Sequence, residues 1–194
     1  MSRRDFADPA ALEAWLRGHG LPLDVWGQGR AKRVADLWAE CAAGETTLHD
    51  DPLQRRVRVA QVLIRRGERL LIEVEQEMTD GRRRARLLPP SEKLKGEESP
   101  LAAAARCLAE ELGLAGRDVK LRELGQPARR VVDSPSYPGL PTIYLIYTVE
   151  ATADALPEAD FWRDNVAQGD VVRRHLWGWR GEQGSKGAGE QGDE

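Results

Sequence analysis

The residues best suited to carry chemistry lie in one segment near the middle of the chain. Residues 99–112 read Ser-Pro-Leu-Ala-Ala-Ala-Ala-Arg-Cys-Leu-Ala-Glu-Glu-Leu, and Ser99, proline and alanines predict a capped helix. At helical spacing, Cys107, Glu110 and Glu111 share one face. Paired carboxylates are hard oxygen ligands of the kind Mg²⁺ takes, and this pair opposes the helix dipole. The alternative is a solvated glutamate pair. An apolar stripe is expected to pack inward, formed by Leu101, Ala104, Ala105, Leu108 and Leu112.

A longer stretch around this helix, from Leu88 to Leu114, resembles the Nudix box, G-x5-E-x7-R-E-U-x-E-E-x-G-U, in which U is a bulky aliphatic residue. Seven of its nine defined positions match in register, carried by Glu98, Arg106, Leu108, Glu110, Glu111, Gly113 and Leu114. The box's opening glycine falls on Glu92, and its glutamate after the arginine is Cys107. The resemblance extends from about Arg56 to Trp179. It implies an α/β Nudix fold, with a mixed β-sheet sandwiched between helices and a small N-terminal helical extension.

The resemblance also implies a divalent-metal site, expected to hold Mg²⁺ or Mn²⁺. Glu110 and Glu111 would bind the metal, and Glu110 would orient or deprotonate the attacking water. Glu97, a spare carboxylate in the preceding loop, would partly replace the missing glutamate. Cys107 would weaken the site, because a thiol is a soft ligand that matches Mg²⁺ poorly.

Further roles follow for the residues around this site. Arg106 would pair with Glu98 and brace the loop. Three cations are expected to steady the leaving phosphate: Lys93, Lys95 and Arg84.

The leading functional hypothesis is a pyrophosphohydrolase that cleaves a nucleoside diphosphate linked to another group, or a related organic pyrophosphate. The first alternative is a catalytically silent Nudix-like module that binds a phosphorylated ligand or a protein partner. A third possibility is a Nudix fold recruited to non-hydrolytic chemistry. Cys107, Glu92 and the replacement of the box's usual Gly-Gly by Pro90-Ser91 motivate the silent-module alternative.

The strands that must position these residues are read from hydrophobic alternation. A first strand is predicted from Arg56, a second at 70–74, and a third at 82–88 after the hairpin signal Asp80-Gly81. Residues 55–86 hold ten arginines and five acidic residues, a local charge of +5. This is either a solvated strand face or a cationic wall for a phosphorylated ligand. Further strands are expected at 119–124, 141–150 and 176–179, and a short helix at 157–167.

A stiff loop rich in proline, serine and glycine, 133–141, carries Tyr137. Tyr137 is a candidate substrate-binding residue in this loop. The alternative is that the loop is a rigid turn before a core strand. The three histidines are scattered without zinc spacing, and they are expected to be surface or packing residues: His19, His49 and His175.

Three regions are predicted along the chain. Residues 1–50 form a helical extension, with one helix after the Asp8-Pro9 start signal and another between Gly29 and Gly44. Residues 55–180 form the Nudix-like domain. Residues 181–194 contain almost no apolar side chain and form a disordered tail.

Composition sets the remaining limits. The 194 residues are 41% hydrophobic and 31% charged, typical of a soluble globular chain. With 29 basic against 32 acidic residues, the net charge of −3 argues against a nucleic-acid partner. No apolar run approaches a membrane span, and two isolated cysteines suggest a reducing compartment. We therefore expect a cytoplasmic protein with a small phosphorylated substrate, no membrane partner and possible homodimerisation.

Overall fold

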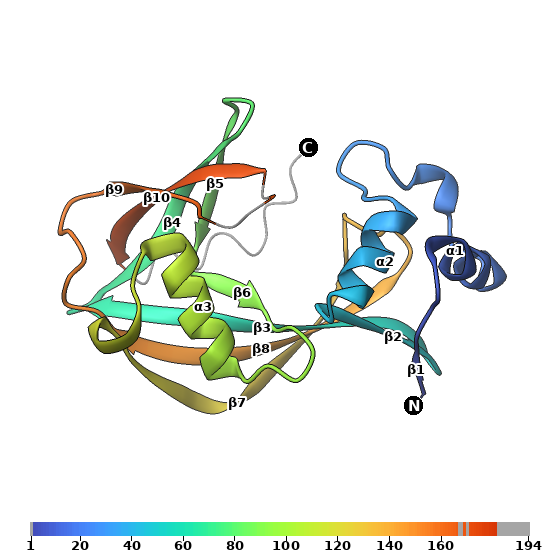
Figure 1. Cartoon of the computed structure of the whole chain (residues 1–194), viewed down its shortest axis with the longest axis horizontal. Helices are drawn as coiled ribbons and strands as arrows, with labels where there is room; N and C mark the ends of the chain where they lie inside the picture. Colours follow the sequence, from blue (N-terminus) through green and yellow to red (C-terminus); the bar gives the residue numbers. More distant parts are fainter. Residues whose placement is uncertain (1, 167–168, 170, 182–194) are drawn as a thin grey trace. The chain divides into compact units, whose positions relative to one another are not determined.

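A computed structural model describes residues 2–166, 169 and 171–181 of the chain (Figure 1). Their contacts divide the chain into two compact units. Unit 1 comprises Met1–Val59, Lys93–Glu98 and Gln126–Tyr147. Unit 2 comprises Ala60–Glu92, Ser99–Gly125 and Thr148–Glu194. The predicted tail lies outside the described residues, apart from Gly181, which ends the last strand.

The described chain is strand-rich, with three α-helices among its strands. They are β1 (Arg3–Arg4), α1 (Pro9–Gly18), α2 (Val34–Ala42), β2 (Thr46–Asp50), β3 (Leu53–Arg66), β4 (Arg69–Met78), β5 (Arg83–Leu88), β6 (Ser91–Lys93), α3 (Pro100–Leu112), β7 (Lys120–Asp133), β8 (Pro141–Thr152), β9 (Phe161–Asp164) and β10 (Val172–Gly181). Two single 3₁₀ turns lie at Leu23–Val25 and Gly116–Asp118. The general prediction of an α/β fold is confirmed. Strands β3, β6, β7 and β8 each contribute residues to both units. The predicted domain boundaries stay a prediction.

Unit 1 contains a small sheet and both N-terminal helices. Strand β2 pairs antiparallel with β1 on one side and with β3 on the other. Helix α1 begins as predicted, because the Asp8 side chain accepts the Ala11 N–H at 2.8 Å and Pro9 follows it. Helix α2 is shorter than predicted. Its N-terminus is closed by Asp36, whose carboxylate accepts the Arg33 backbone N–H at 2.8 Å.

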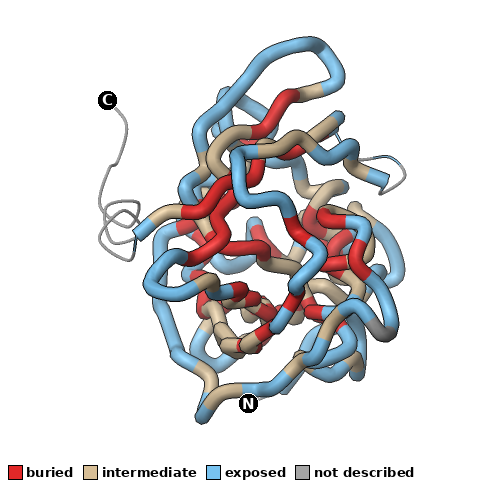
Figure 2. The backbone as a smooth tube through the Cα atoms, turned by 90° about the vertical axis from the view of Figure 1, so that its left-hand side faces the viewer, coloured by how far each residue is buried: buried red, intermediate tan, exposed pale blue. Residues whose placement is uncertain are grey.

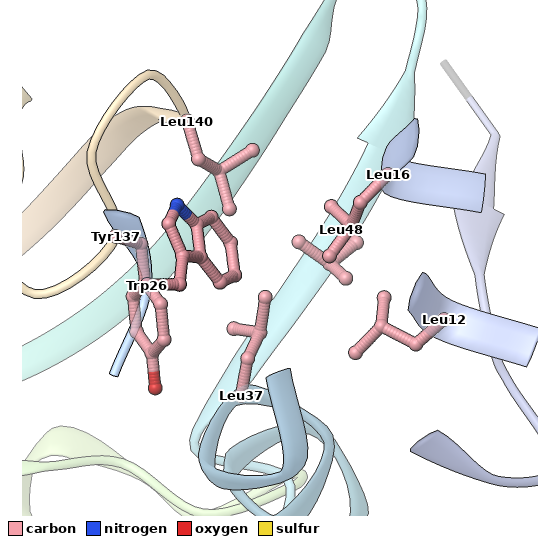
Figure 3. Close-up of a cluster of buried hydrophobic side chains, with 7 residues drawn as sticks. All are labelled: Leu12, Leu16, Trp26, Leu37, Leu48, Tyr137 and Leu140. Carbon is pink, nitrogen blue, oxygen red and sulfur yellow. The ribbon is translucent and has the colours of Figure 1, made fainter. Parts of the chain in front are cut away.

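The apolar core of unit 1 gathers side chains from both helices, from β2 and from the loop before β8 (Figure 3). Its buried members are Leu12, Leu16, Trp26, Leu37, Leu48, Tyr137 and Leu140. Trp26 also donates its indole N–H to the Pro138 carbonyl at 3.0 Å. Two short helices are unstable alone, and this burial is what holds them.

In unit 2 the strand β10 lies between β4 and β9, and β5 pairs with the other edge of β4 (Figure 1). All of these pairings are antiparallel. The Asp80-Gly81 hairpin joins β4 to β5 as predicted, with Gly81 at φ +83°. Buried and intermediate positions alternate along 60–64 of β3, whereas β4 has a run of four buried residues, Leu70–Glu73. Figure 2 shows buried, intermediate and exposed segments along the backbone.

Three sequence predictions are wrong. The short helix expected at 157–167 is instead the strand β9, where Phe161 and Trp162 pair with β10. Tertiary pairing and the strand preference of aromatic residues outweigh a weak helical pattern there. Strands β1 and β2 lie in a region predicted as helical only. On α3, Leu101 and Ala105 are exposed, whereas Cys107 is fully buried, so the packed stripe is rotated from the predicted one.

Within the described residues, no helix is both long enough and apolar enough to cross a membrane.

Candidate functional site

Helix α3 has the local structure its sequence predicts. The Ser99 hydroxyl accepts the Ala102 N–H at 3.2 Å, and Pro100 occupies the first turn. Gly113 ends the helix at φ +67°, a left-handed conformation that glycine adopts without a Cβ penalty. These two caps fix the register of α3, and with it the direction of Cys107 and Glu111 into unit 2.

Glu111 is the most perturbed carboxyl of the candidate site. Its pKa is raised to about 8, chiefly by burial and then by the negative charges of Glu73 and Glu92. Arg86 and a hydrogen bond with Cys107 act in the opposite direction but do not cancel the rise. Glu73 comes from β4 and Glu92 from β6, so three elements bring their carboxyls together. We call Glu73, Glu92 and Glu111 the carboxylate cluster.

Two members of the cluster are in contact with nitrogen-bearing side chains, Glu73 with His175 and Arg86 and Glu92 with Arg106. The Glu73 carboxylate lies 2.5 Å from Nδ1 of His175 and 3.3 Å from Nε of Arg86. The Glu92 carboxylate lies 3.2 Å from Arg106, which also approaches Glu110 at 3.9 Å. Glu111 therefore has the weakest cationic compensation within the carboxylate cluster, consistent with its high pKa.

Cys107 lies fully buried beside Glu111. Burial raises the pKa of its thiol far above the ordinary value, and the carboxyls of Glu111 and Glu92 add to the effect. The thiol is therefore protonated at neutral pH. It is a hydrogen-bond donor to the cluster rather than a thiolate ligand or nucleophile.

The donor set of the carboxylate cluster suits a hard cation. Its ligands are all carboxylate oxygens, and a divalent cation would relieve the mutual repulsion that raises the pKa of Glu111. In the part of the chain that the structure describes, no three His, Cys, Asp or Glu side chains form a converged metal-binding group. Binding would therefore require rotamer changes within the cluster.

The predicted metal and bracing residues are divided between the two units. Glu110 and Glu111 lie on α3 in unit 2, whereas Glu97 and Glu98 lie in unit 1. The Glu98 carboxylate accepts the backbone N–H of Lys95 at 3.0 Å. The pairing of Glu98 with Arg106 stays a prediction. So does the metal site that Glu97 was expected to share with Glu110 and Glu111.

The predicted phosphate-binding cations have different environments. Lys93 lies 3.1 Å from Glu45 and 3.4 Å from Glu40, so carboxylates already neutralise its charge. The Lys95 side chain is exposed in unit 1. Arg84 is exposed on β5, and its Nε donates to the Gln76 side chain at 2.7 Å. Arg84 is thus placed on the same unit as the carboxylate cluster.

Tyr137 is a core residue, which corrects its proposed place on a substrate wall. Its side chain is fully buried, and the hydroxyl donates to the Glu40 carboxylate at 3.0 Å. Its ring packs 5.2 Å from the ring of Trp26 and 4.9 Å from the Arg55 guanidinium. This placement agrees with the alternative interpretation, in which the loop 133–141 is a rigid turn before a core strand.

Sequence reasoning missed Glu73, Glu92 and His175 as members of the site. Glu73 had a signal, because it interrupts the apolar run Leu70–Val74 at a position that is only 5% exposed. Glu92 had none beyond its place at the altered opening of the box. His175 had none either, since its partner Glu73 lies 102 residues away.

No known family model matches the chain. No curated protein matches it with significant similarity either. The carboxylate cluster and the resemblance of α3 and its flanking residues to the Nudix box are therefore the features that bear on function.

Proposed function

We propose that the chain is a divalent-metal-dependent hydrolase of the Nudix type, acting on a nucleoside diphosphate linked to another group or on a related organic pyrophosphate. One observation carries the proposal. Glu111, which occupies a metal-ligand position of the resembled box, has a pKa raised to about 8 by burial and by two neighbouring carboxyls. A buried, strongly perturbed carboxyl with named charge partners is a typical sign of a functional site.

The carboxylate cluster would hold the cation in this proposal. Glu111, Glu73 and Glu92 supply oxygen ligands, and Glu110 lies next to them on the more open side of α3 with about a third of its side chain exposed. When bound, Mg²⁺ or Mn²⁺ would neutralise pyrophosphate charge and lower the pKa of bound water.

The chain's own residues have separate tasks. Glu110 is accessible enough to orient a water molecule or take its proton. His175 and Arg86 fix the Glu73 carboxylate from two sides, and Arg106 fixes Glu92. Exposed Arg84 provides a guanidinium that can bind phosphate oxygens in a bidentate manner.

A second candidate is a catalytically silent module of the same type that binds a phosphorylated ligand or a protein. The observation that favours it is Cys107, whose protonated, buried thiol occupies the position of a glutamate in the resembled box. With a thiol at that position, the site has one oxygen ligand fewer than the resembled box provides.

Phosphate and pyrophosphate release from nucleoside di- and triphosphates, sugar nucleotides and dinucleotides, with Mg²⁺ and with Mn²⁺, tests the first function. We expect metal-dependent turnover that Glu110→Gln and Glu111→Gln each reduce by at least about 100-fold. Glu123→Gln, at an exposed position on β7, is the matched control and is expected to keep full activity. Metal-independent turnover, or equal activity in all variants, would exclude the proposed site. Ligand-induced stabilisation without turnover would favour the silent module.

A further inference from the structure

Unit 1 carries a second polar site, on the face of its sheet turned away from its apolar core. The register pairs Arg3 with His49 and Thr47 with Arg56. Because side chains alternate along a strand, these four residues and Arg58 share one face. The next residue of β2 after Thr47, Leu48, points to the other face and belongs to the apolar core.

A cavity of about 260 Å³ opens on this face. Its polar lining includes the side chains of Arg3, Arg56, Arg58, Thr47 and His49, and Leu145 adds an apolar side chain. All of these residues belong to unit 1. Arg58 also donates to the Gly96 carbonyl, which ties the loop 93–98 to the wall of the cavity. The volume lies just below the range of roughly 300–1,000 Å³ that holds drug-sized ligands, so it suits a small molecule.

The lining has an excess of positive charge. Three arginines line the cavity against two glutamates, Glu45 and Glu97. Outside the lining, Lys93 lies 3.1 Å from the Glu45 carboxylate, and Asp5 lies 3.0 Å from Arg3. The pKa of His49 is lowered by burial first, and then by the positive charges of Arg56 and Arg3. The imidazole is therefore a neutral donor and acceptor in a cationic cavity.

His49 is an independent sign of a missing ligand. It is 9% exposed, and its Nδ1 has no hydrogen-bond partner among the described residues. Its Nε2 is 3.1 Å from the Thr47 hydroxyl, which fixes the orientation of the ring. Buried polar atoms in folded proteins nearly always have a partner, and a polar occupant of the cavity that His49 lines would supply one.

We propose that this cavity binds the phosphate group of a small phosphomonoester. Guanidinium groups match the tetrahedral oxyanion through paired N–H donors, and a threonine hydroxyl and a neutral imidazole add directional hydrogen bonds. The cavity is lined by residues of unit 1, whereas the carboxylate cluster consists of residues of unit 2, so the two proposals rest on different residues. Failure of either proposal would leave the other standing.

Titration of the full chain with inorganic phosphate, adenosine monophosphate and adenosine tests the proposal. Nuclear magnetic resonance signals of the His49 ring and calorimetry would be followed at constant ionic strength, with chloride as the reference anion. We expect saturable binding of phosphate and of the monophosphate, with a shift of the His49 signals. Adenosine and chloride are expected to produce neither. The tighter of the two phosphate ligands identifies whether free phosphate or a larger ester is the better occupant, and either order supports the proposal.

Two variants make the test specific. Arg56→Gln should weaken phosphate binding by about tenfold or more, because it removes the charge-assisted hydrogen bonds of one guanidinium. Arg129→Gln, at an exposed arginine of β7 in the same unit, should leave it unchanged. If Arg56→Gln does not fold, Arg3→Gln on the exposed strand β1 replaces it, with the same expectation. Absence of saturable binding, equal effects in the cavity and control variants, or adenosine binding as tightly as the monophosphate would overturn the proposal.

Discussion

Tyr137 donates its phenolic hydrogen to Oε1 of Glu40 at 3.0 Å, joining two residues that are 97 positions apart in the chain. The same carboxylate contacts Lys32 at 2.7 Å and Arg55 at 2.6 Å. Burial alone would raise the pKa of Glu40, but the charges of Lys93, Arg55 and Lys32 outweigh it and lower the pKa to about 2. A carboxylate with this many partners is a structural anchor for unit 1.

Replacement of Glu40 should therefore destabilise the protein in a pH-dependent manner. A folded-state pKa of about 2 against the ordinary 4.5 gives stability that is present above pH 4.5 and lost as the pH falls toward 2. For Glu40→Gln we expect a loss of about 2–3 kcal/mol in the free energy of unfolding at pH 7, after allowance for partial solvent screening, and a smaller loss at pH 3. Urea unfolding at both pH values measures it. Glu13→Gln, in an exposed ion pair, is the control, and an equal loss in both variants would contradict the assigned role.

Removal of the Tyr137 hydroxyl isolates one hydrogen bond of this network. Tyr137→Phe keeps the ring in the core and leaves the Glu40 carboxylate with its cationic partners. We expect a loss of about 1–2 kcal/mol in the free energy of unfolding. Tyr147→Phe, at a partly exposed tyrosine of β8, is the matched control. No difference between the two variants in urea unfolding would show that the hydroxyl contributes little.

The raised pKa of Glu111 predicts that its contribution to stability depends on pH in the opposite direction to that of Glu40. Its folded-state pKa of about 8 exceeds the ordinary 4.5, so its contribution is favourable below pH 4.5 and is lost as the pH rises through 8. The free energy of unfolding should fall between these limits by up to about 1.4 kcal/mol per pH unit, because the folded state holds the extra proton. Glu111→Gln should flatten this decline and be more stable than the unmodified chain at pH 8. Glu110→Gln should show the same decline in the free energy of unfolding as the unmodified chain. Its absence in Glu111→Gln alone would assign the decline to the Glu111 carboxyl.

Metal binding should compete with that proton. If the carboxylate cluster holds Mg²⁺ or Mn²⁺, either ion should raise the unfolding temperature more at pH 8 than at pH 5.5, since Glu111 must lose its proton to bind. The increase should disappear in Glu111→Gln and persist in Glu123→Gln. An equal increase at both pH values, or one that survives Glu111→Gln, would place the metal elsewhere.

Restoring the missing acid tests the position of Cys107. Cys107→Glu adds a buried carboxyl beside Glu111 and should lower the metal-free stability by about 3 kcal/mol or more. Mg²⁺ should recover more stability in this variant than in the unmodified chain, because the new oxygen ligand joins the cluster. Cys107→Gln has nearly the same size without the charge, so it should show the loss without the enhanced recovery. Equal recovery in the two variants would mean that Cys107 is not at a ligand position.

The helix α3 shows how much of the site its sequence alone predicts. Its caps, its length and the shared face of Cys107 and Glu111 follow from local rules of capping and periodicity. The sequence did not predict that the pKa of Glu111 would be raised to about 8. That rise depends on burial and on the carboxyls of Glu73 from β4 and Glu92 from β6.

The sequence by itself determined the α/β class, the start of α1, the limits of α3 and the hairpin at Asp80-Gly81. These features depend on neighbouring residues, whose hydrogen bonding and periodicity are local. Only the tertiary structure decided that Tyr137 enters the core and that 161–164 forms a strand. It also decided that Glu73 and Glu92 surround Glu111. Burial and Coulomb interactions act between residues far apart in sequence, so they are set when distant segments pack together.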